Sequence, residues 1–587
     1  MNTQGKDNNT SERAYSYHTF IYTFTYSTDE YQKIEVENGD DTFWEKIKDV
    51  DDLLKGVEEN EEERAAYNSL CYFTPKARNA IFNTNNHNTS VSYKYKIPEG
   101  IIMKYVIESH QEDKISLFIR EMKLTLFPKI KVGILSINLE NYDDAREKDK
   151  FSGIRRAAQI NDWGRRLFFP NRSEKGDDQK NSYIETKGIG IYAENEQGET
   201  EELFYTDFEQ QYQKNKEKEN SMVVKPQLID ALLGSAIKNE FHIADFQSVF
   251  DDRMFTCSLI IDDFVSKEIK TYNQEKGDYV CYLPGQMFPN TDIEISSLLY
   301  GYVFIDSKLH ECSCQNRNFR KELLKKHIYD RWIDYGTLYG FTEYAMTCII
   351  DGSDDSYHIV KGTFLTQYVE LVKLCLMQRA AINVIETDIV NSCNMIHPEQ
   401  NESIDIEKIS EIWKINVIFQ NELYLPEVTF QEQGVEIYNI LKKSLKIEEL
   451  NEEIGTKLNN LHELAALLEN KRKEKNELKT VKAMNFFSIL LGLVAIGDIW
   501  GFVDSLFVAY DTDQRGPYFT INCLSAADIR VIEIGVIAIF VLVCISFIIF
   551  CNWDRNKKGK RTKWRIMNCG WMKAVTSKMR EKKGKKS

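Results

Sequence analysis

The sequence predicts an α+β cytoplasmic body, a long stalk helix and a C-terminal two-helix transmembrane hairpin. Alternating polar and apolar residues before residue 435 favour strands mixed with helices. A heptad pattern of apolar residues follows, and two apolar segments at 486–509 and 531–551 come last. Each apolar segment exceeds the ~20 residues that a helix needs to cross a hydrocarbon core of ~30 Å. We therefore expect a membrane protein with a large part outside the membrane.

Composition and pattern divide the chain into six regions. These are an N-terminal α+β lobe at 1–170, a polar insertion at 171–225, a second α+β region at 226–435, a stalk helix at 436–483, the hairpin at 484–551 and a basic tail at 552–587. The insertion is rich in charged residues, and only one short strand is expected in it, at 188–193.

Local patterns predict the elements of the two α+β regions. Strands are expected at 15–26, 90–97, 101–107, 114–127, 130–140, 254–262, 299–306 and 338–350. Helices are expected at 43–57, after Pro75, at about 143–163 and at 364–385. The strands at 114–127 and 130–140 are separated only by Pro128 and Lys129, which predicts a hairpin.

The stalk is expected to be one continuous helix from 436 to 507. Its heptad positions carry Ile447, Leu450, Ile454, Leu461, Leu464 and Leu468. No proline occurs between Pro426 and Pro517, and Gly455 is the only weak point. Such a helix is either a dimeric coiled-coil tether or a stalk that transmits movement of the body to the first span.

Charge sets the expected orientation. The formal net charge of the chain is −15, yet the tail from residue 552 carries 14 Lys or Arg against two acidic residues. A second cluster of basic residues, at 471–482, precedes the first apolar segment. The loop 510–530 contains only two basic residues, Arg515 and Arg530. Basic flanks mark the cytoplasmic side, so both termini are expected in the cytoplasm.

No motif predicts catalysis. The chain contains no phosphate-binding loop, no GxSxG, no HExxH and no kinase signature, so we do not expect an enzyme. Its 12 cysteines are scattered, and Cys312 and Cys314 beside His310 lack a second pair for a zinc site. Ordinary reduced thiols are therefore expected, with no bound metal and no cofactor.

An arginine cluster between residues 154 and 170 is the first candidate ligand site. It contains Arg155, Arg156, Asn161, Arg165 and Arg166 on an expected helix and its C-terminal turn. Guanidinium groups bind phosphate through paired hydrogen bonds, which makes the cluster suited to a phosphate-bearing ligand. The alternative is that these cations form ion pairs with an acidic body.

A second candidate site follows at 331–340. Arg331, Trp332 and Thr337 offer a guanidinium, an aromatic plate and a hydroxyl. Such a set can hold an adenylate through a charged contact and stacking. Burial of the aromatic residues in a core is the alternative.

The first apolar segment carries small and polar residues at helical spacing. Pore-lining positions are expected at Asn485, Ser488, Gly492, Asp498 and Asp504. A carboxylate in hydrocarbon is costly and usually faces water or a partner. Helix packing through small residues, with Asp504 at the interface, is the alternative.

The order of body, stalk, hairpin and lysine-rich tail resembles the CorA family of pentameric magnesium channels. The family's Gly-Met-Asn signature at the outer end of the first span is missing, because this chain reads Trp-Gly-Phe-Val-Asp at 500–504. Magnesium selectivity is therefore not implied, and Mg²⁺ or another divalent cation is at most a permeant ion.

The body looks more like the CorA-like proteins encoded beside type III CRISPR systems. The segments that carry this resemblance are IRRAAQINDWGRRLFFP at 154–170, RWIDYGTLYGFTEYAM at 331–346, LMQRAAI at 376–382 and NELYLPEVTFQEQGVEIY at 421–438. The resemblance implies an effector of antiviral defence in the bacterial inner membrane. Its ligand would be a nucleotide second messenger, either a cyclic oligoadenylate or S-adenosylmethionine joined to AMP.

Messenger binding would open or perturb the membrane part and arrest growth. Two spans cannot enclose a pore, so a homo-oligomer, a pentamer by the resemblance, is expected. No direct contact with nucleic acid is expected. The alternatives are a constitutive divalent cation channel of CorA type and a membrane-anchored enzyme that acts on nucleotides.

Overall fold

The computed structural model describes most of the chain before residue 511. The described ranges are 13–29, 43–47, 61–82, 89–110, 113–143, 151–168, 186–211, 225–250, 252–276, 295–306, 313–394, 406–511 and, beyond these, 531, 534–535 and 538. The chain forms two compact units, Met1–Glu474 and Lys475–Ser587. Helix α14, Ile447–Asp511, belongs to both.

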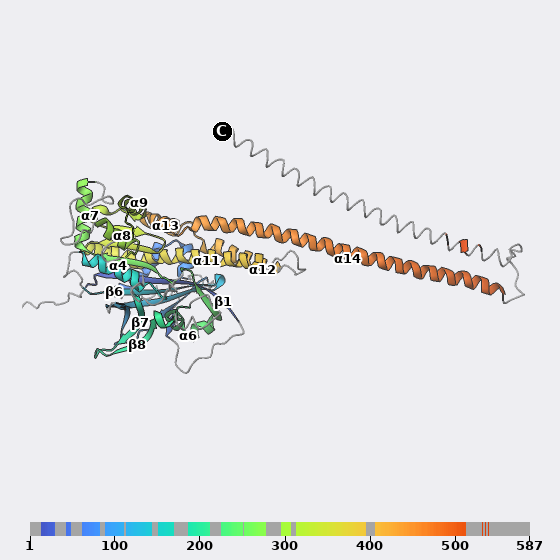
Figure 1. Cartoon of the computed structure of the whole chain (residues 1–587), viewed down its shortest axis with the longest axis horizontal. Coiled ribbons are helices and arrows are strands. Elements are labelled where there is room, and N and C mark those ends of the chain that lie inside the picture. Colours follow the sequence, from blue (N-terminus) through green and yellow to red (C-terminus); the bar gives the residue numbers. More distant parts are fainter. Residues whose placement is uncertain are drawn as a thin grey trace, which may run out of the picture. The chain divides into compact units, whose positions relative to one another are not determined.

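The first unit is built on a large mixed sheet, as Figure 1 shows. Its strands are β1 Ser16–Thr28, β2 Trp44–Lys46, β3 Val91–Tyr95, β4 Ile102–Ser109, β5 Lys114–Phe127, β6 Val132–Asn141, β7 Thr186–Glu194, β8 Thr200–Asp207, β9 Ile243–Ser248, β10 Phe255–Ile261, β11 Ile328–Tyr329, β12 Leu338–Phe341 and β13 Ala345–Ile350. The order along the sheet is β11-β12-β13-β10-β1-β6-β5-β4-β7-β8. Residues on both sides of the polar stretch at 171–225 therefore share one sheet.

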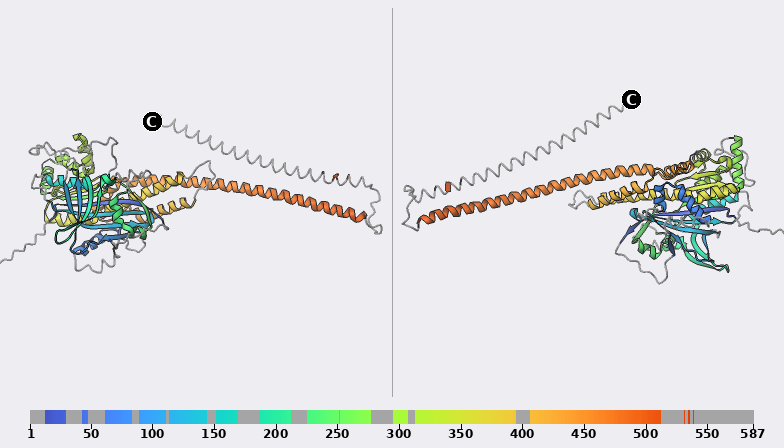
Figure 2. Two further views of the ribbon diagram at one scale, coloured as in Figure 1. Left: turned by 60° about the horizontal axis from the view of Figure 1, so that its bottom comes forward. Right: turned by 180° about the vertical axis from the view of Figure 1, so that it is seen from behind.

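The helices lie on both faces of this sheet (Figure 2). They are α2 Glu61–Tyr72, α3 Pro75–Phe82, α4 Ser152–Gly164, α6 Gln227–Glu240, α7 Asp263–Lys276, α8 Ile295–Val303, α9 Arg317–His327, α10 Lys361–Thr363, α11 Val369–Asn394, α12 Ile406–Ile418 and α13 Glu432–Ser444. Helix α11 packs on β1 and β6, and α4 packs with α8 on β1 and β10. An α+β body with long helices is thus confirmed.

Strand β1 explains why the sheet is covered on both sides. Alternate side chains of a strand point to opposite faces. Tyr17 and Ile21 join the hydrophobic cluster that contains α11, whereas Phe20, Tyr22 and Phe24 join the cluster on the opposite face. A strand buried on both faces belongs at the centre of a sheet, and β1 lies between β10 and β6.

Several predicted elements agree with the structure. The hairpin forms as β5 and β6, with Pro128–Ile130 as a short 3₁₀ turn between them. The strands at 15–26, 90–97, 101–107 and 254–262 correspond to β1, β3, β4 and β10. The helices after Pro75 and at 364–385 correspond to α3 and α11, and the described part of 143–163 is α4.

Four predictions of local structure are wrong. The single strand predicted at 338–350 is two antiparallel strands, β12 and β13, with a turn between them. Residues 299–306 were expected as a strand but lie largely in α8. The helix predicted at 43–57 is replaced at Trp44–Lys46 by strand β2, which pairs with β3, while 48–57 lies outside the described residues. The insertion holds two paired strands rather than one, since β7 pairs with β8 as well as with β4.

The stalk is not one helix from 436. Helix α13 ends at Ser444 and α14 begins at Ile447. Between them Lys446 has a φ of 54°, in the left-handed region that breaks a right-handed helix. The first part of α14 packs on the body through Ile447, Ile454, Leu458 and Leu461.

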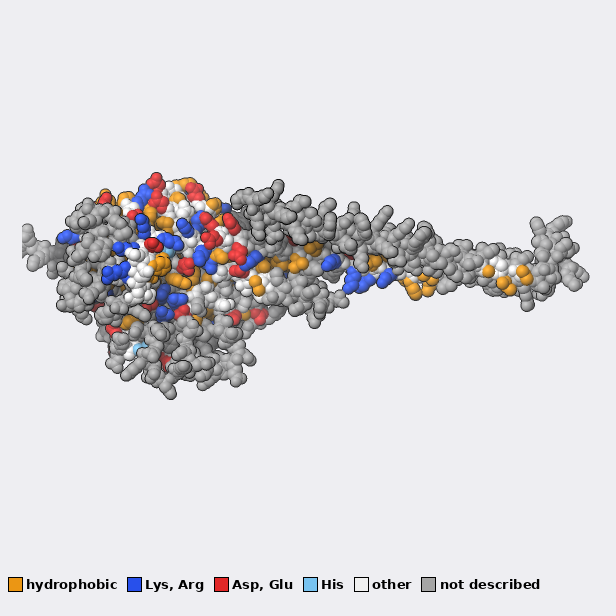
Figure 3. Space-filling model, turned by 45° about the horizontal axis from the view of Figure 1, so that its top comes forward, with side chains coloured by type: hydrophobic (Ala, Val, Ile, Leu, Met, Phe, Trp, Pro, Cys, Tyr) orange, Lys and Arg blue, Asp and Glu red, His pale blue; other side chains and the backbone are white. Residues whose placement is uncertain are grey.

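The second unit contains the rest of α14. Its exposed side chains change from basic to apolar along the helix, as Figure 3 shows. Exposed fractions are 57% for Leu478, 63% for Phe486 and 67% for Leu491. The two predicted spans, 486–509 and 531–551, fall in this unit, and most of the second lies outside the described residues. Measured over the residues that the structure describes, none of its helices combines the length and the apolar character that a membrane span requires.

Candidate ligand site around helix α4

Helix α4 lies against the centre of the sheet because one of its faces is apolar and its C-terminal residue is small. Ile154 and Ala157 join a hydrophobic cluster with α7 and α8, and Trp163 joins the cluster under β1. A Cβ atom on Gly164 would lie 2.7 Å from the ring of Phe20 on β1. Glycine therefore lets the end of α4 approach the strand, which carries the residues that follow, Arg165 and Arg166, down to the sheet.

A buried polar network fills the space between α4 and the sheet. Nδ1 of His18 lies 2.7 Å from Oδ1 of Asn161 and Nε2 lies 2.9 Å from Oγ of Ser16, while Asn141 donates to the same Oγ. These contacts are consistent when His18 is neutral with its proton on Nδ1, since Ser16 can then donate to Nε2. Burial lowers the pKa of His18 to about 4, so the neutral form prevails near pH 7. The Tyr302 hydroxyl lies 3.1 Å from Oγ of Ser258, which lies 3.3 Å from His18 Nδ1.

The same layer contains hydrogen-bonding atoms that no protein atom satisfies. In the part of the chain that the structure describes, Nδ2 of Asn161, Nε and Nη1 of Arg165, and the hydroxyls of Thr256 and Thr347 are buried without a hydrogen-bond partner. These four residues are at most 4% exposed. Asn161 and Arg165 are four residues apart and share one face of the α4 turn. Each such buried donor costs free energy, so the layer is suited to a ligand that supplies acceptors.

Among the described residues that pair around Arg165, cations outnumber carboxylates. Arg165 lies 3.6 Å from Asp162, Arg166 pairs with Asp162 at 3.4 Å and with Asp252 at 3.1 Å, and Arg253 pairs with Asp252 at 3.2 Å. Three cations face two carboxylates in this group of five residues. Burial lowers the pKa of Arg165 to about 10, which still leaves the guanidinium charged at neutral pH. An anion would complete both the charge balance and the hydrogen bonds.

Arg156 of the predicted cluster points elsewhere. Arg156 pairs with Asp113 and Asp143, each at 3.2 Å, and donates to Gln159. Arg156 therefore forms ion pairs within the body, which was the alternative to ligand binding. Arg155 is partly buried near the start of α4. Of the five predicted residues, the structure brings Asn161, Arg165 and Arg166 together at one end of the helix.

The second predicted cluster is already engaged within the protein. Arg331 binds Glu436 and Glu432 of α13, each at 2.7 Å, and its guanidinium lies 5.7 Å from the ring of Trp332. Trp332 is 38% exposed, whereas Thr337 is buried, and its backbone N–H donates to the carbonyl oxygen of Trp332. The ligand-binding role of Arg331, Trp332 and Thr337 stays a prediction.

The predicted pore-lining residues lie on α14. Asn485, Ser488 and Asp498 are exposed, and Gly492 has open space where a Cβ atom would lie. The side chain of Asp504 lies outside the described residues. Their role stays a prediction.

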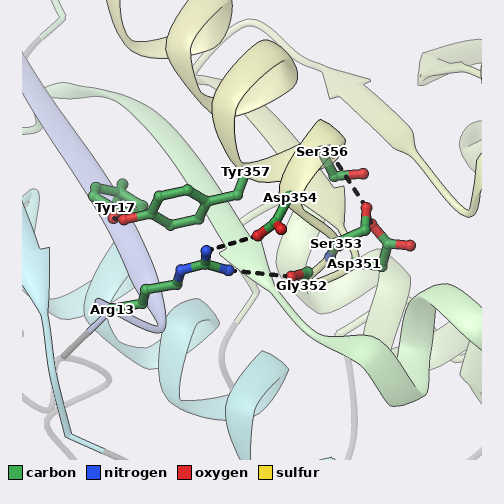
Figure 4. Close-up of polar contacts among 8 residues, drawn as sticks. All are labelled: Arg13, Tyr17, Asp351, Gly352, Ser353, Asp354, Ser356 and Tyr357. Carbon is green, nitrogen blue, oxygen red and sulfur yellow. Dashed lines mark hydrogen bonds and ion pairs between the residues drawn. The ribbon is translucent and has the colours of Figure 1, made fainter. Parts of the chain in front are cut away.

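Sequence analysis does not single out a polar cluster where β1 begins (Figure 4). Arg13 binds Asp354 at 2.8 Å and lies 4.4 Å from the ring of Tyr357, and Lys361 lies 3.8 Å from the same ring. The hydroxyls of Tyr17 and Tyr357 are 3.3 Å apart. Burial alone would raise the pKa of Tyr357, but the Tyr17 hydroxyl and the Lys361 charge lower it. The spacing of Tyr357 and Lys361, one helical turn, is the signal that could have revealed the contact.

Comparison of the chain with protein-family models, with curated proteins and with solved structures finds no match. Among the described residues, no group of three His, Cys, Asp or Glu side chains could hold a metal ion. The function must therefore be argued from the residues of the chain itself.

Proposed function

We propose that this protein is a membrane effector of antiviral defence that binds a nucleotide second messenger at helix α4. The observation that supports ligand binding most directly is the set of buried donors on Asn161 and Arg165 that meet no acceptor. A phosphate oxygen would satisfy these donors and balance the extra cation. The messenger is S-adenosylmethionine joined to AMP or a cyclic oligoadenylate, as the sequence resemblance implies.

Membrane attachment is supported by the apolar segments at 486–509 and 531–551 and by the basic residues that flank them. Apolar side chains of α14 between Leu478 and Val494 are exposed, at 46–67% for most of them. A helix with apolar residues on all sides is stable when lipid or protein covers it. We place both termini in the cytoplasm and propose that messenger binding opens or perturbs the membrane part, in a homopentamer.

Binding of a labelled messenger to the detergent-solubilised full chain tests the ligand site. Arg165→Gln removes a buried, charged donor, so we expect the binding free energy to fall by about 2–4 kcal/mol. Arg120→Gln is the matched control, because Arg120 is 53% exposed and pairs at 3.6 Å with Glu140, which lies opposite Tyr17 on the face of the sheet away from α4. Unchanged binding in Arg165→Gln protein that remains folded would refute the site.

Direct tests distinguish two alternative functions from this proposal. A constitutive divalent cation channel would restore growth of a magnesium-transport-deficient strain without messenger, which the proposed effector should not do. A membrane-anchored nucleotide-processing enzyme would turn over the messenger, whereas the proposed receptor returns it unchanged. Native mass spectrometry of the detergent complex tests the pentamer, and a monomer or dimer would contradict it.

A further inference from the structure

The junction of α13 and α14 is a break that side chains hold in place. Lys446 adopts the left-handed conformation there although it carries a Cβ atom. Lys442 of α13 binds Glu448 of α14 across the break at 2.8 Å, and Lys446 lies 3.4 Å from Glu343 in the turn between β12 and β13. Two ion pairs therefore hold this junction, one between the two helices and one to the sheet.

Arg331 ties α13 to the edge of the sheet through two ion pairs. It reaches Glu432 and Glu436, one helical turn apart on α13, and Tyr329 of β11 donates to the same Glu436. These carboxylates raise the pKa of Arg331 and hold it charged. A guanidinium shared by two carboxylates on one helix fixes the rotation of that helix better than a single pair does.

The segment that carries Arg331 is anchored on the same hydrophobic cluster as α4. Leu338 belongs to the hydrophobic cluster that also contains Ile154 and Ala157 of α4, and Ile333 packs against this cluster. Gly336 has a φ of 74°, and its carbonyl oxygen accepts from Oγ of Ser266 on α7 at 3.0 Å. A Cβ atom on Gly336 would lie 2.1 Å from that Oγ, so the segment and α7 are in direct contact. A shift of α4 or α7 can therefore reach Arg331 through packed side chains.

We propose that Arg331, with Glu432 and Glu436, is a clasp that couples the α4 side of the body to helix α13, with Lys446 as the hinge to α14. Arg331 is a positioning residue in this proposal rather than a ligand contact. The clasp deepens the proposed function, because it names the element through which ligand binding would reach the membrane part. Its existence as a mechanical tie does not depend on which ligand binds.

Hydrogen–deuterium exchange of the full chain in detergent, without messenger, tests the tie itself. Arg331→Gln should speed amide exchange in α13 and in residues 445–450 by about fivefold, since the lost ion pairs are partly exposed and individually weak. The double variant Glu432→Gln with Glu436→Gln should give the same increase. Combining all three changes should add nothing further. Lys473→Gln is the matched control, because Lys473 pairs with Glu469 within α14 and ties no second element.

A second readout separates the clasp from the ligand site. The Arg331→Gln protein should bind labelled messenger with an affinity within twofold of that of the parent. The messenger concentration at which it arrests cell growth should differ from that of the parent. The clasp would be overturned if the amide exchange rates in α13 of Arg331→Gln stay within 1.5-fold of those in the parent. It would also be overturned if the effects of the Arg331, Glu432 and Glu436 substitutions on exchange simply add. Loss of messenger binding in Arg331→Gln would also overturn it, by making Arg331 a ligand contact. The ligand site at α4 is tested separately, since unchanged messenger affinity in Arg165→Gln would refute that site and leave the clasp standing.

Discussion

Arg165 and Arg331 are the same residue type in two predicted sites, yet the protein uses them in opposite ways. Arg165 is 4% exposed, meets one carboxylate at 3.6 Å and keeps two buried N–H groups without acceptors. Arg331 is partly exposed and has two carboxylates at 2.7 Å. Burial lowers the pKa of Arg165, whereas carboxylates raise the pKa of Arg331. An arginine with spare donors can take a ligand, and one with satisfied donors holds the structure together.

Low pH should destabilise the fold most strongly through His18, on the α4 side of the sheet. The pKa of His18 is about 4 in the folded protein against about 6.5 when unfolded. Between these values the unfolded chain binds the additional proton, so the contribution of His18 is fully present above pH 6.5 and is lost as the pH falls to 4. We expect a loss of about 3 kcal/mol in unfolding free energy over this range. Chemical denaturation should show this loss for the parent, whereas His18→Gln should lose about 3 kcal/mol less over the same pH range.

Two glycine-to-alanine substitutions should change the free energy of unfolding in opposite directions. Gly164→Ala places a Cβ atom 2.7 Å from Phe20, and overpacking of this kind costs about 1–3 kcal/mol. Gly455→Ala in α14 meets open space and should stabilise the helix by about 0.5–1 kcal/mol. Thermal unfolding of both variants measures the difference. A neutral Gly164→Ala would mean that α4 does not approach β1 this closely.

Substitution of Lys446, at the hinge, should change the free energy of unfolding by a smaller amount. Lys446→Gly relieves the left-handed strain of a residue with a Cβ atom, so we expect a gain of about 0.5–1 kcal/mol despite the greater freedom of the unfolded chain. Lys443→Gly, within the last turn of α13, should instead cost about 1 kcal/mol. If both changes destabilise equally in denaturant titrations, Lys446 does not break the helix in solution.

Local pattern predicted the central strands well because they are long and alternate clearly. The hairpin of β5 and β6 and the central strand β1 belong to this class. A strand was predicted at 299–306 because Tyr, Val and Phe favour strands, yet Leu299, Tyr302 and Val303 fall on one face of a helix and are buried. Tertiary packing decided this segment, and the sequence alone does not contain that packing.

The α4 site shows a similar limit. The concentration of arginines between 155 and 166 was visible in the sequence, but not which guanidinium would be buried. Gly164 brings Arg165 to the sheet, while Arg156 finds Asp113 and Asp143 from distant segments. The hinge at Lys446 could not be predicted either, because no glycine or proline marks it. Its conformation depends on contacts with Glu343 and on the packing of both helices.

Arg165→Met tests the central claim that the α4 layer is a site completed by a ligand. Methionine fills a similar length without charge, and Asp162 and Asp252 keep Arg166 and Arg253 as partners. Because a buried cation with unsatisfied donors is costly, the variant without ligand should be as stable as the parent or more stable. The rise in melting temperature that the messenger gives the parent should disappear. A variant that loses about 3 kcal/mol or more of stability and still gains melting temperature with messenger would show that Arg165 supports the fold and that the ligand binds elsewhere.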